Sequence, residues 1–281
     1  MTGEFRRAGA WPQLEIRRSC TENSCYRPHS HDTVSIGLID EGTSVFRGPP
    51  GGTVRLLPGD VVVIPAGHVH ACNPDAGRWR YQMVHLDETW AASLLDRDDP
   101  SSRALMNEVR VLRRPDLHRR ISEACDAILT LDPATDTDPD TDPDVHLAPV
   151  LRAVAAAAPD HVVPDGTDAA LRARLRPVLE RLRGDETNPP LDELARLVGL
   201  SRGELVRAVR RATGLSPLAW RQNARIVRAR NLLRAGRPIA DTAQALGFTD
   251  QSHFHRVFRA HVAASPGVYR GRAHERTRPT A

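Results

Sequence analysis

The sequence predicts a two-domain chain of the α+β class, with an N-terminal β-barrel and trailing helices followed by an all-α domain of two helix-turn-helix units. Three observations predict it. Short apolar runs separated by turn residues extend to about residue 86, a helical apolar period follows, and a helix-turn-helix pattern is repeated near the C-terminus. At 281 residues, 40% of them hydrophobic, the chain is long enough to bury two cores.

The N-terminal part alternates short apolar runs with glycine, proline and asparagine, which favours a sandwich or a barrel. The clearest predicted strands are 35–39, 54–57, 60–64 and 81–86. Beyond residue 88 the period becomes helical, and Pro115 separates two predicted helices. Their apolar faces consist of Leu105, Val109 and Leu112, and of Ile121, Cys125 and Ile128.

The segment from Asp132 to Asp144 is acidic and rich in proline, so we expect a disordered insert that buries no apolar surface. A short helix at about 145–158 and a linker at 159–167 follow it. The predicted boundaries are therefore 1–131 for the first domain and 132–168 for the insert, short helix and linker. The second domain spans 169–272, and 273–281 form a flexible tail.

Charge is distributed unevenly along the chain. From residue 169 onward there are 22 arginines against 9 acidic residues, whereas the first 168 residues hold 17 arginines against 26 acidic ones. This asymmetry indicates that the C-terminal part alone meets a polyanion. A merely solvated arginine-rich surface is the alternative explanation of the charge.

The sequence shows no run of ~20 apolar residues that would span a bilayer and no apolar run typical of a secretory signal. We therefore expect a cytoplasmic protein with no membrane partner. The four cysteines, Cys20, Cys25, Cys72 and Cys125, have no paired spacing, so neither a disulfide framework nor a zinc ribbon is indicated.

An internal near-repeat carries the strongest signal. Residues 191–200 (LDELARLVGL) align with 239–248 (IADTAQALGF), each with an alanine at its fifth position and a glycine at its ninth. The small alanine lets two helices approach closely, and the glycine permits the left-handed turn that ends the first of them. This pattern predicts two helix-turn-helix units, a motif whose second helix enters the major groove of DNA.

The second helix of each unit has its own start signal. Ser201 and Glu204 have the spacing of a capping box, and Thr249 or Asp250 caps the other copy. Between the units, Ser216 and Pro217 open a long helix that runs to about residue 233. Its predicted buried stripe includes Leu218, Ile226, Ala229 and Leu233. Such a rod, roughly 27 Å long, could hold the two units about one DNA turn (~34 Å) apart.

Residues 171–270 resemble the DNA-binding domain of the AraC/XylS family. The run 214–233 (GLSPLAWRQNARIVRARNLL) looks like the family's linker helix, and 239–270 looks like its signature. Val209 and Trp220 stand where the family usually has phenylalanine and tyrosine, and both remain apolar. The resemblance implies a one-component transcription regulator that forms a homodimer, binds double-stranded promoter DNA and acts on RNA polymerase.

The resemblance also implies which side chains face the bases. They are Arg202, Gly203, Val206 and Arg207 in the first unit, and Gln251, Ser252, His255 and Arg256 in the second. Arginine can bond guanine bidentately and glutamine can do the same to adenine. Alternatively, Arg207 and Arg256 pair only with phosphates or nearby acids. We expect the phosphate contacts, which set register rather than sequence, from Arg210, Arg211, Arg221 and Arg259.

The stretch from His29-Ser30-His31 to His70 resembles the cupin barrel that many AraC-type regulators use as an effector domain. Alternate residues of a strand point the same way, so His29 and His31 can converge with the later His70. Metal-binding cupins add a glutamate shortly after the pair, and residues 33–37 contain no carboxylate.

Three interpretations of the histidines stay open. They line an organic-ligand pocket together with Tyr81, they satisfy structural hydrogen bonds, or His29, His31 and His70 hold a divalent metal such as zinc or ferrous iron. Cys25 and Cys72 flank them and are most simply buried thiols. Trp79 and Tyr81 supply an aromatic wall or a packing face.

The sequence thus predicts a regulator, not an enzyme, whose barrel senses a small molecule and whose helix-turn-helix units bind promoter DNA. One alternative is a metal-dependent cupin enzyme joined to a DNA-binding domain, against which the missing glutamate counts. Another is a ligand-independent activator whose barrel only pairs two subunits.

Overall fold

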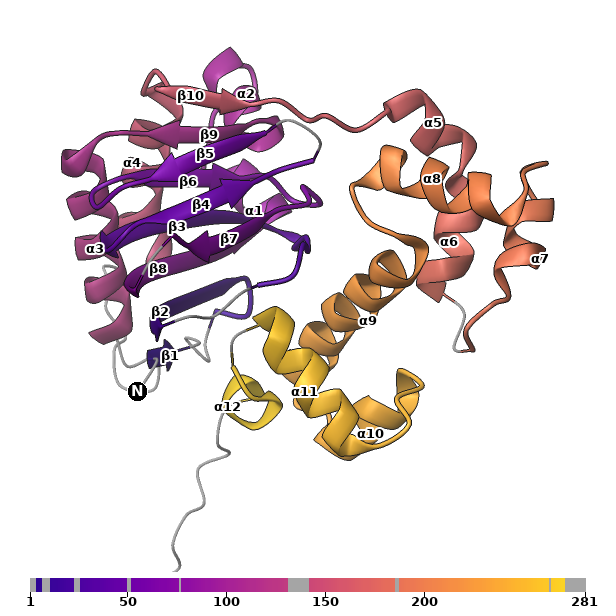
Figure 1. The fold of residues 1–281 in the computed structure, drawn as a ribbon. Coiled ribbons are helices and arrows are strands. Elements are labelled where there is room, and N and C mark those ends of the chain that lie inside the picture. The colour runs from indigo at the N-terminus through magenta and orange to yellow at the C-terminus, as the bar shows by residue number, and fades with distance from the viewer. Residues whose placement is uncertain are drawn as a thin grey trace, which may run out of the picture.

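The computed structural model describes residues 4–6, 11–22, 26–49, 52–75, 77–130, 142–184, 187–262 and 264–270. Figure 1 shows a β-rich part built from the first 163 residues, called here the barrel domain, and a helical part beyond it, called the helical domain. The predicted fold class is confirmed. Cys25, most of the acidic segment, and the C-terminal tail lie outside the described residues.

The strands of the barrel domain form two antiparallel sheets rather than one closed ring. The large sheet contains, in spatial order, β1 (Glu4–Arg6), β2 (Leu14–Glu22), β8 (Arg78–Asp87), β3 (Thr33–Glu41), β6 (Val61–Ile64), β9 (Val109–Leu112) and β10 (His161–Val163). The small sheet contains β5 (Thr53–Leu56), β4 (Ser44–Arg47) and β7 (Ala71–Pro74).

Both faces of the large sheet are buried, because successive side chains of a strand point to opposite faces. On β3, Val34, Ile36 and Leu38 join the core under the helices, whereas Ile39 joins a second core with Phe46 and Leu56 of the small sheet. The space between the two sheets is therefore the interior of the barrel. Residues of odd number on β2 and β8, where these strands pair in register, point into it.

The outer face of the large sheet is covered by α1 (Glu88–Ser93), α2 (Pro100–Asn107), α3 (Pro115–Thr130) and α4 (Pro143–Ala156). The prediction that Val109 and Leu112 continue a helix is wrong, because 109–112 form β9 and pair with β6. A four-residue apolar run is too short for its period to distinguish strand from helix.

Residues 143–163, predicted as a short helix and linker, are part of the barrel domain. Leu147, Leu151 and Val154 of α4 are buried in the core on the outer face of the sheet, and β10 pairs with β9. Arg110 of β9 reaches the end of α4 and donates to the carbonyls of Ala155 (3.2 Å) and Ala157 (3.0 Å), which lack partners within the helix. The connection between the domains is thus confined to about 164–168.

The helical domain contains α5 (Ala169–Arg174), α6 (Arg176–Gly184), α7 (Leu191–Arg196), α8 (Arg202–Thr213), α9 (Pro217–Arg234), α10 (Ile239–Ala245), α11 (Gln251–Val262) and α12 (Pro266–Arg270). The repeated glycines adopt the predicted left-handed conformation, with φ +67° at Gly199 and +65° at Gly247. Ser201 and Glu204 form the capping box of α8, and Asp250 accepts from the backbone of His253 at the start of α11.

Two separate cores stabilise the two helix-turn-helix units, and α9 contributes to both. Trp220 lies in the first core with α6 to α8, and Ile226 and Leu233 lie in the second with Phe254 and Phe258. Leu218, predicted to be buried, is 66% exposed. None of the described helices combines the length and the hydropathy needed to span a membrane.

Candidate effector pocket and DNA interface

The three predicted histidines meet at the mouth of the barrel. His29 and His70 come from two loops that exchange backbone hydrogen bonds of 2.9 and 2.8 Å, and His31 follows two residues later. The ring centroids lie 4.7 to 5.2 Å apart, and one nitrogen of each ring lies within 4.8 Å of the others. His85 of β8 adds a fourth ring, 4.7 Å from that of His31.

Hydrogen bonds fix the tautomers of these rings. Nδ1 of His29 donates to the carbonyl of Arg27 (2.6 Å), and Nδ1 of His70 donates to that of His68 (3.0 Å), so both keep a lone pair on Nε2. His31 is different, because its Nδ1 lies 3.0 Å from Nη1 of Arg230. An arginine can only donate, so His31 accepts on Nδ1 and its proton sits on Nε2.

This arrangement does not fit a metal ion. Metal ligation needs a free lone pair on each imidazole, and His31 has one nitrogen bonded to Arg230 and the other protonated. Among the described residues, the group whose potential ligand atoms lie within 4.8 Å of one another consists of the three histidines, without a carboxylate. The histidines are nevertheless neutral, as ligands would be. Burial lowers the pKa of His70 to about 4, and burial, with neighbouring histidines, lowers the pKa of His29 and His31 well below the usual value.

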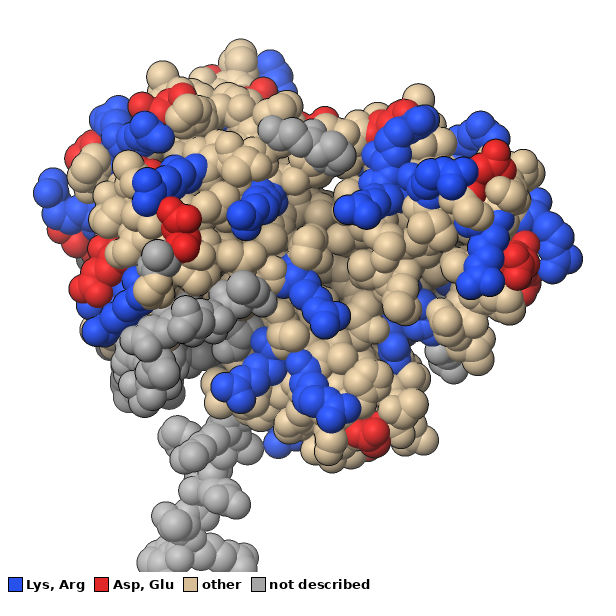
Figure 2. Space-filling view, in the orientation of Figure 1, with Lys and Arg blue, Asp and Glu red and all other residues tan. Residues whose placement is uncertain are grey.

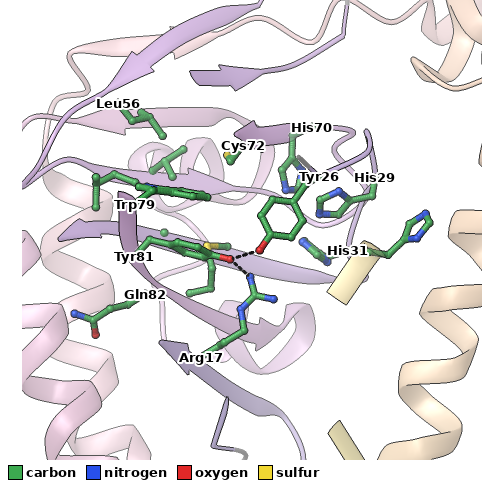
Figure 3. A pocket seen from close by; sticks show the side chains of 15 residues that line it. Arg17, Tyr26, His29, His31, Leu56, His70, Cys72, Trp79, Tyr81 and Gln82 are labelled. Atoms are coloured by element: carbon green, nitrogen blue, oxygen red, sulfur yellow. Dashed lines mark hydrogen bonds between the residues drawn. The ribbon is translucent and has the colours of Figure 1, made fainter. Parts of the chain in front are cut away.

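A cavity extends from the histidines into the barrel (Figure 3). All four predicted pocket residues, His29, His31, His70 and Tyr81, line it. Its apolar walls come from Ile39, Leu56, Val62, Met83 and the stacked rings of Trp79 and Tyr81, whose centroids lie 4.0 Å apart. Burial raises the pKa of the Cys72 thiol in this wall to about 12, which agrees with an unreactive thiol.

Sequence reasoning missed four polar residues of the cavity: Arg17, Tyr26, Gln82 and His261. Arg17 points inward from β2, and its Nη2 donates to the hydroxyl of Tyr81 (3.0 Å), which lies 2.9 Å from the hydroxyl of Tyr26. His261 comes from α11, the second recognition helix. The cavity is therefore lined by both domains.

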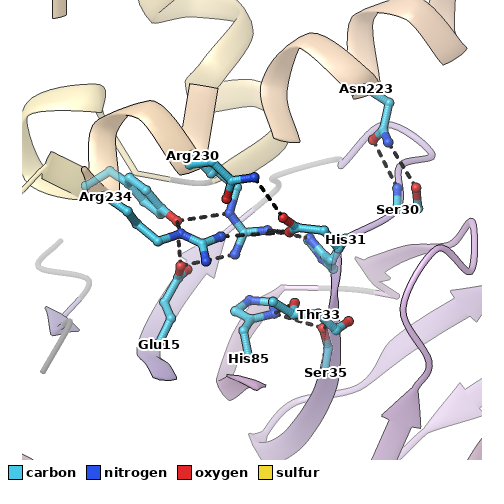
Figure 4. Close-up of polar contacts among 12 residues, drawn as sticks. Glu15, Ser30, His31, Thr33, Ser35, His85, Asn223, Arg230 and Arg234 are labelled. Atoms are coloured by element: carbon cyan, nitrogen blue, oxygen red, sulfur yellow. Dashed lines mark hydrogen bonds and ion pairs between the residues drawn. The ribbon is translucent and has the colours of Figure 1, made fainter. Parts of the chain in front are cut away.

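The helical domain is held at the barrel mouth by a buried polar network (Figure 4). Nη2 of Arg230, on α9, lies 3.0 Å from Oε2 of Glu15 on β2, and both side chains are at most 5% exposed. The hydroxyl of Tyr269 donates to the same carboxylate oxygen (2.7 Å). Burial, the largest single effect, raises the pKa of Glu15, but the charge of Arg230 together with smaller effects from His85, Tyr269 and Arg234 outweighs burial and lowers the pKa to about 2.

Further contacts tie each part of the helical domain to the barrel. Asn223 on α9 exchanges two hydrogen bonds with Ser30, at 3.0 and 2.9 Å. Nη1 of Arg17 donates to the carbonyl of Val262 at the end of α11. On the other side, Val69 of the barrel is buried in the core of the first helix-turn-helix unit.

Most of the predicted DNA-contacting side chains lie on the surface of α8 and α11. Six are exposed: Arg202, Gly203, Arg207, Gln251, Ser252 and Arg256. Val206 and His255 are half-buried, and Nε2 of His255 is shielded from solvent without a hydrogen-bond partner among the described residues. His255 would therefore have to rotate to reach a base.

Three of the four predicted phosphate contacts are exposed: Arg210, Arg211 and Arg259. Arg211 pairs with Asp168 at 3.1 Å. The fourth, Arg221, is only 4% exposed and lies on the buried side of α9, so this side chain would have to be uncovered before it could reach a phosphate. Figure 2 shows arginines spread over the helical domain on the face in view, with fewer acidic residues among them.

The chain matches two family models. The model described as an AraC-like ligand binding domain matches residues 12–142, and the one described as a helix-turn-helix domain matches 194–272. The matches cover most of each domain and leave residues 143–193, which include α4, β10, α5 and α6, unassigned between them.

Curated relatives agree with these matches. The arabinose operon regulatory protein of Salmonella typhimurium is 27% identical over 232 residues, which cover 76% of this chain and 75% of that protein. Its counterpart in Escherichia coli is 36% identical over 97 residues, and the transcriptional activator RhaS of Escherichia coli is 36% identical over 89. These two shorter matches cover about a third of each protein.

Two solved structures share the fold. ToxT from Vibrio cholerae O395 superposes with a TM-score of 0.52 at 12% identity, covering 92% of this chain and 97% of that one. ToxT of another Vibrio cholerae strain, with an unsaturated fatty acid bound, gives 0.51 at 15% identity, covering 92% and 94%. With a cupin-like ligand-binding domain joined to a double helix-turn-helix domain, this chain belongs to the AraC/XylS family of transcription regulators.

Proposed function

We propose that an effector binds in the barrel cavity and that its binding changes how α11 is held against the barrel, and so how the regulator engages its promoter. One observation carries this proposal: the cavity contains groups of both domains. His261 of α11 lines it, and Arg17 within it bonds the carbonyl of Val262. An effector there interacts with the second helix-turn-helix unit directly, without a long relay.

The size of the cavity supports this coupling. Its volume is about 40 Å³, room for about three waters at ~10–15 Å³ each. An organic effector must therefore displace side chains that close the cavity. Two of these side chains are Tyr26, which is half-buried, and His261, which is buried at 8% exposure next to the last residue of α11, so displacing His261 would disturb the end of that helix. A ligand that requires this displacement binds with different affinity to the protein with α11 docked as described and to the protein with α11 displaced. That difference is the condition for a ligand to control DNA binding.

The pocket residues of the proposal are His29, His31, His70 and Tyr81. The base contacts are Arg202, Gly203, Val206, Arg207, Gln251, Ser252, His255 and Arg256, with Arg210, Arg211 and Arg259 on phosphates. Most of the proposed DNA-contacting side chains are exposed while the helical domain is docked on the barrel, which supports their assignment. The barrel domain then ends near residue 163 and the DNA-binding domain spans about 169–272.

The barrel serves binding rather than turnover in this proposal. An enzyme of the cupin type would need a complete metal shell, and the tautomer of His31 and the lack of a carboxylate in the described group of potential ligands argue against one. We also propose that the chain forms a homodimer through the helices of 88–131 and contacts RNA polymerase when bound to DNA.

The proposal is tested first on DNA. Full-length protein is titrated onto its own upstream intergenic DNA and onto random DNA over a salt series. We expect a specificity ratio of order 10³ or more and, for both DNAs, affinity that falls steeply with salt. Equal binding to both would reject specific recognition at that locus.

The second part of the proposal, that an effector changes DNA binding, is tested on the same protein–DNA complex. Compounds that raise the melting temperature of the full-length protein are added to the DNA titration. We expect at least one to change the affinity for upstream DNA, and the change to be lost in Val62→Trp, which fills the cavity. The matched control is Val162→Trp, an exposed position on β10. Binding that changes stability but never DNA affinity would reject the coupling.

A further inference from the structure

Among the described residues, Arg17 is the one charged side chain that lines the cavity. Burial lowers the pKa of all four histidines in the lining, and none of the lining residues is an aspartate or glutamate. Oε2 of Glu15, the nearest acid on β2, is bonded by Arg230 and Tyr269. Arg17 itself forms no ion pair with any described carboxylate. The charge of Glu15 acts on this guanidinium without a direct contact, so the described residues leave Arg17 in a largely apolar pocket without an ion-pair partner, an arrangement that is costly unless an anion completes it.

Hydrogen-bond donors without acceptors gather at the same place. Nε of Arg17 is buried and has no partner among the described residues. The hydroxyls of Tyr26 and Tyr81 share one hydrogen bond, so the hydrogen of one of them also lacks an acceptor in the described part of the chain. Nε1 of Trp79, whose ring stacks on that of Tyr81, likewise has no hydrogen-bond partner among the described residues. Buried donors normally have partners, so this cluster lacks an acceptor group.

Resting on the proposed function, which places the effector in this cavity, we infer that the effector is a small apolar or aromatic carboxylic acid whose carboxylate binds Arg17 and the tyrosine pair. The carboxylate supplies the missing charge and accepts from Nε of Arg17 and from the spare tyrosine hydroxyl. The hydrocarbon part lies along Leu56, Val62 and the stacked rings of Trp79 and Tyr81. The neutral isosteric amide supplies neither the charge nor the second acceptor oxygen.

Through Arg17, the binding of such an acid would also affect the helical domain. Nη1 of the same guanidinium donates to the carbonyl of Val262, the last residue of α11. One side chain would therefore join the carboxylate to the recognition helix. A neutral ligand confined to the apolar wall would lack this connection.

The test compares acids with their amides on the full-length protein. Benzoate with benzamide, and hexanoate with hexanamide, are titrated at pH 7 and matched ionic strength, with the melting temperature and calorimetric affinity as readouts. We expect at least one acid to bind at least tenfold more tightly than its amide. In Arg17→Met this preference is lost, and in Tyr81→Phe it is reduced. Arg18→Met is the matched control, since Arg18 is the next residue of β2, faces outward and pairs with Asp126 at 2.6 Å.

The outcomes separate the two proposals. Amides that bind as tightly as acids, or an acid preference that survives Arg17→Met, overturn the carboxylate assignment and leave the cavity as the effector site. No acid-specific binding in either pair also overturns it. Loss of specific binding to upstream DNA in the ligand-free protein is a failure of the proposed function instead, and it is measured independently of any acid. If Arg17→Met does not fold, the affinities for acid and amide are compared in Tyr81→Phe and Arg17→Lys instead.

Discussion

Arg230 and Glu15 form a buried ion pair across the two domains, 215 residues apart in sequence and 3.0 Å apart in space. The pair places the middle of α9, the helix that joins the two helix-turn-helix units, against the interior edge of the barrel. Because α9 contributes to both helical cores, fixing α9 on the barrel also fixes the relative position of the two units. The barrel is thus positioned to control both units at once.

Removing only one partner of this pair should be strongly destabilising. In Arg230→Met the carboxylate of Glu15, almost fully buried, loses its cation, at a cost of about 3–5 kcal/mol in the free energy of unfolding. The double variant Glu15→Gln/Arg230→Met removes both charges and should recover most of that loss. Urea unfolding of the full-length protein measures both effects.

Arg228→Met, an exposed position on the same helix, serves as the control. If Arg230→Met were no more destabilising than Arg228→Met, or if the double variant were no more stable than the single one, the ion pair would not hold the domains together.

The helix-turn-helix domain could be predicted almost element by element because its signals are local. A glycine with positive φ, a capping box and a serine-proline helix start each act within a few residues. The structure contains each of them, at Gly199 and Gly247, at Ser201 with Glu204, and at Ser216 with Pro217.

The missed features depend on contacts between distant segments. Neither Glu15 nor Arg17 stands out in a predicted strand until the pairing of β2 with β8 shows that they face the interior. The period of α9 places Leu218 on the buried stripe and the family resemblance places Arg221 on a phosphate, whereas the packing of α9 leaves Leu218 66% exposed and Arg221 4% exposed. The packing of α4 was likewise hidden, because its partners on α3 precede the acidic segment.

Two arginines of α11 should differ in what they contribute to DNA binding. Arg256→Ala should weaken binding to the operator by about 1–3 kcal/mol and leave random DNA almost unaffected, because a base contact is lost. Arg259→Ala should weaken both DNAs alike and reduce the salt slope by about one, because a phosphate contact is lost. Fluorescence anisotropy with both DNAs measures the difference, with Arg120→Ala on the exposed face of α3 as the control. Equal losses on operator and random DNA for Arg256→Ala contradict its assignment to a base.

Acid should destabilise the barrel in a defined pH window. Burial lowers the pKa of His70 to about 4, against 6.5 for an unperturbed histidine, so the unfolded chain binds more protons between these values. Stability is therefore full above pH 6.5 and falls as the pH drops towards 4, by up to about 3–4 kcal/mol for this one histidine at ~1.4 kcal/mol per pKa unit. His29, His31 and His85 shift in the same direction.

Melting temperatures between pH 4 and 8 test this dependence. His70→Gln should flatten the curve in the window, whereas His161→Gln, at an exposed position on β10, should leave it unchanged. A stability that is constant from pH 7 to 5, or one that His161→Gln alters as much as His70→Gln, would contradict the role of the buried histidines.

Metal binding at the histidine triad should depend on Arg230. In the wild-type protein Arg230 occupies Nδ1 of His31 and leaves the proton on Nε2, so we expect less than 0.1 metal per chain in protein purified without a histidine tag, roughly the level of incidental binding. In Glu15→Gln/Arg230→Met the ring of His31 can take the tautomer of its neighbours. Three imidazole lone pairs then face one point, and the affinity for zinc should rise at least tenfold, about 1.4 kcal/mol.

Elemental analysis and zinc titration of the two proteins measure these expectations. Adding His70→Ala to the double variant should abolish the gain, because only two lone pairs remain. Stoichiometric metal in the wild-type protein would mean that Arg230 does not hold His31 in solution. An unchanged zinc affinity in the double variant would mean that the triad lacks the geometry for a metal even when its tautomers permit one.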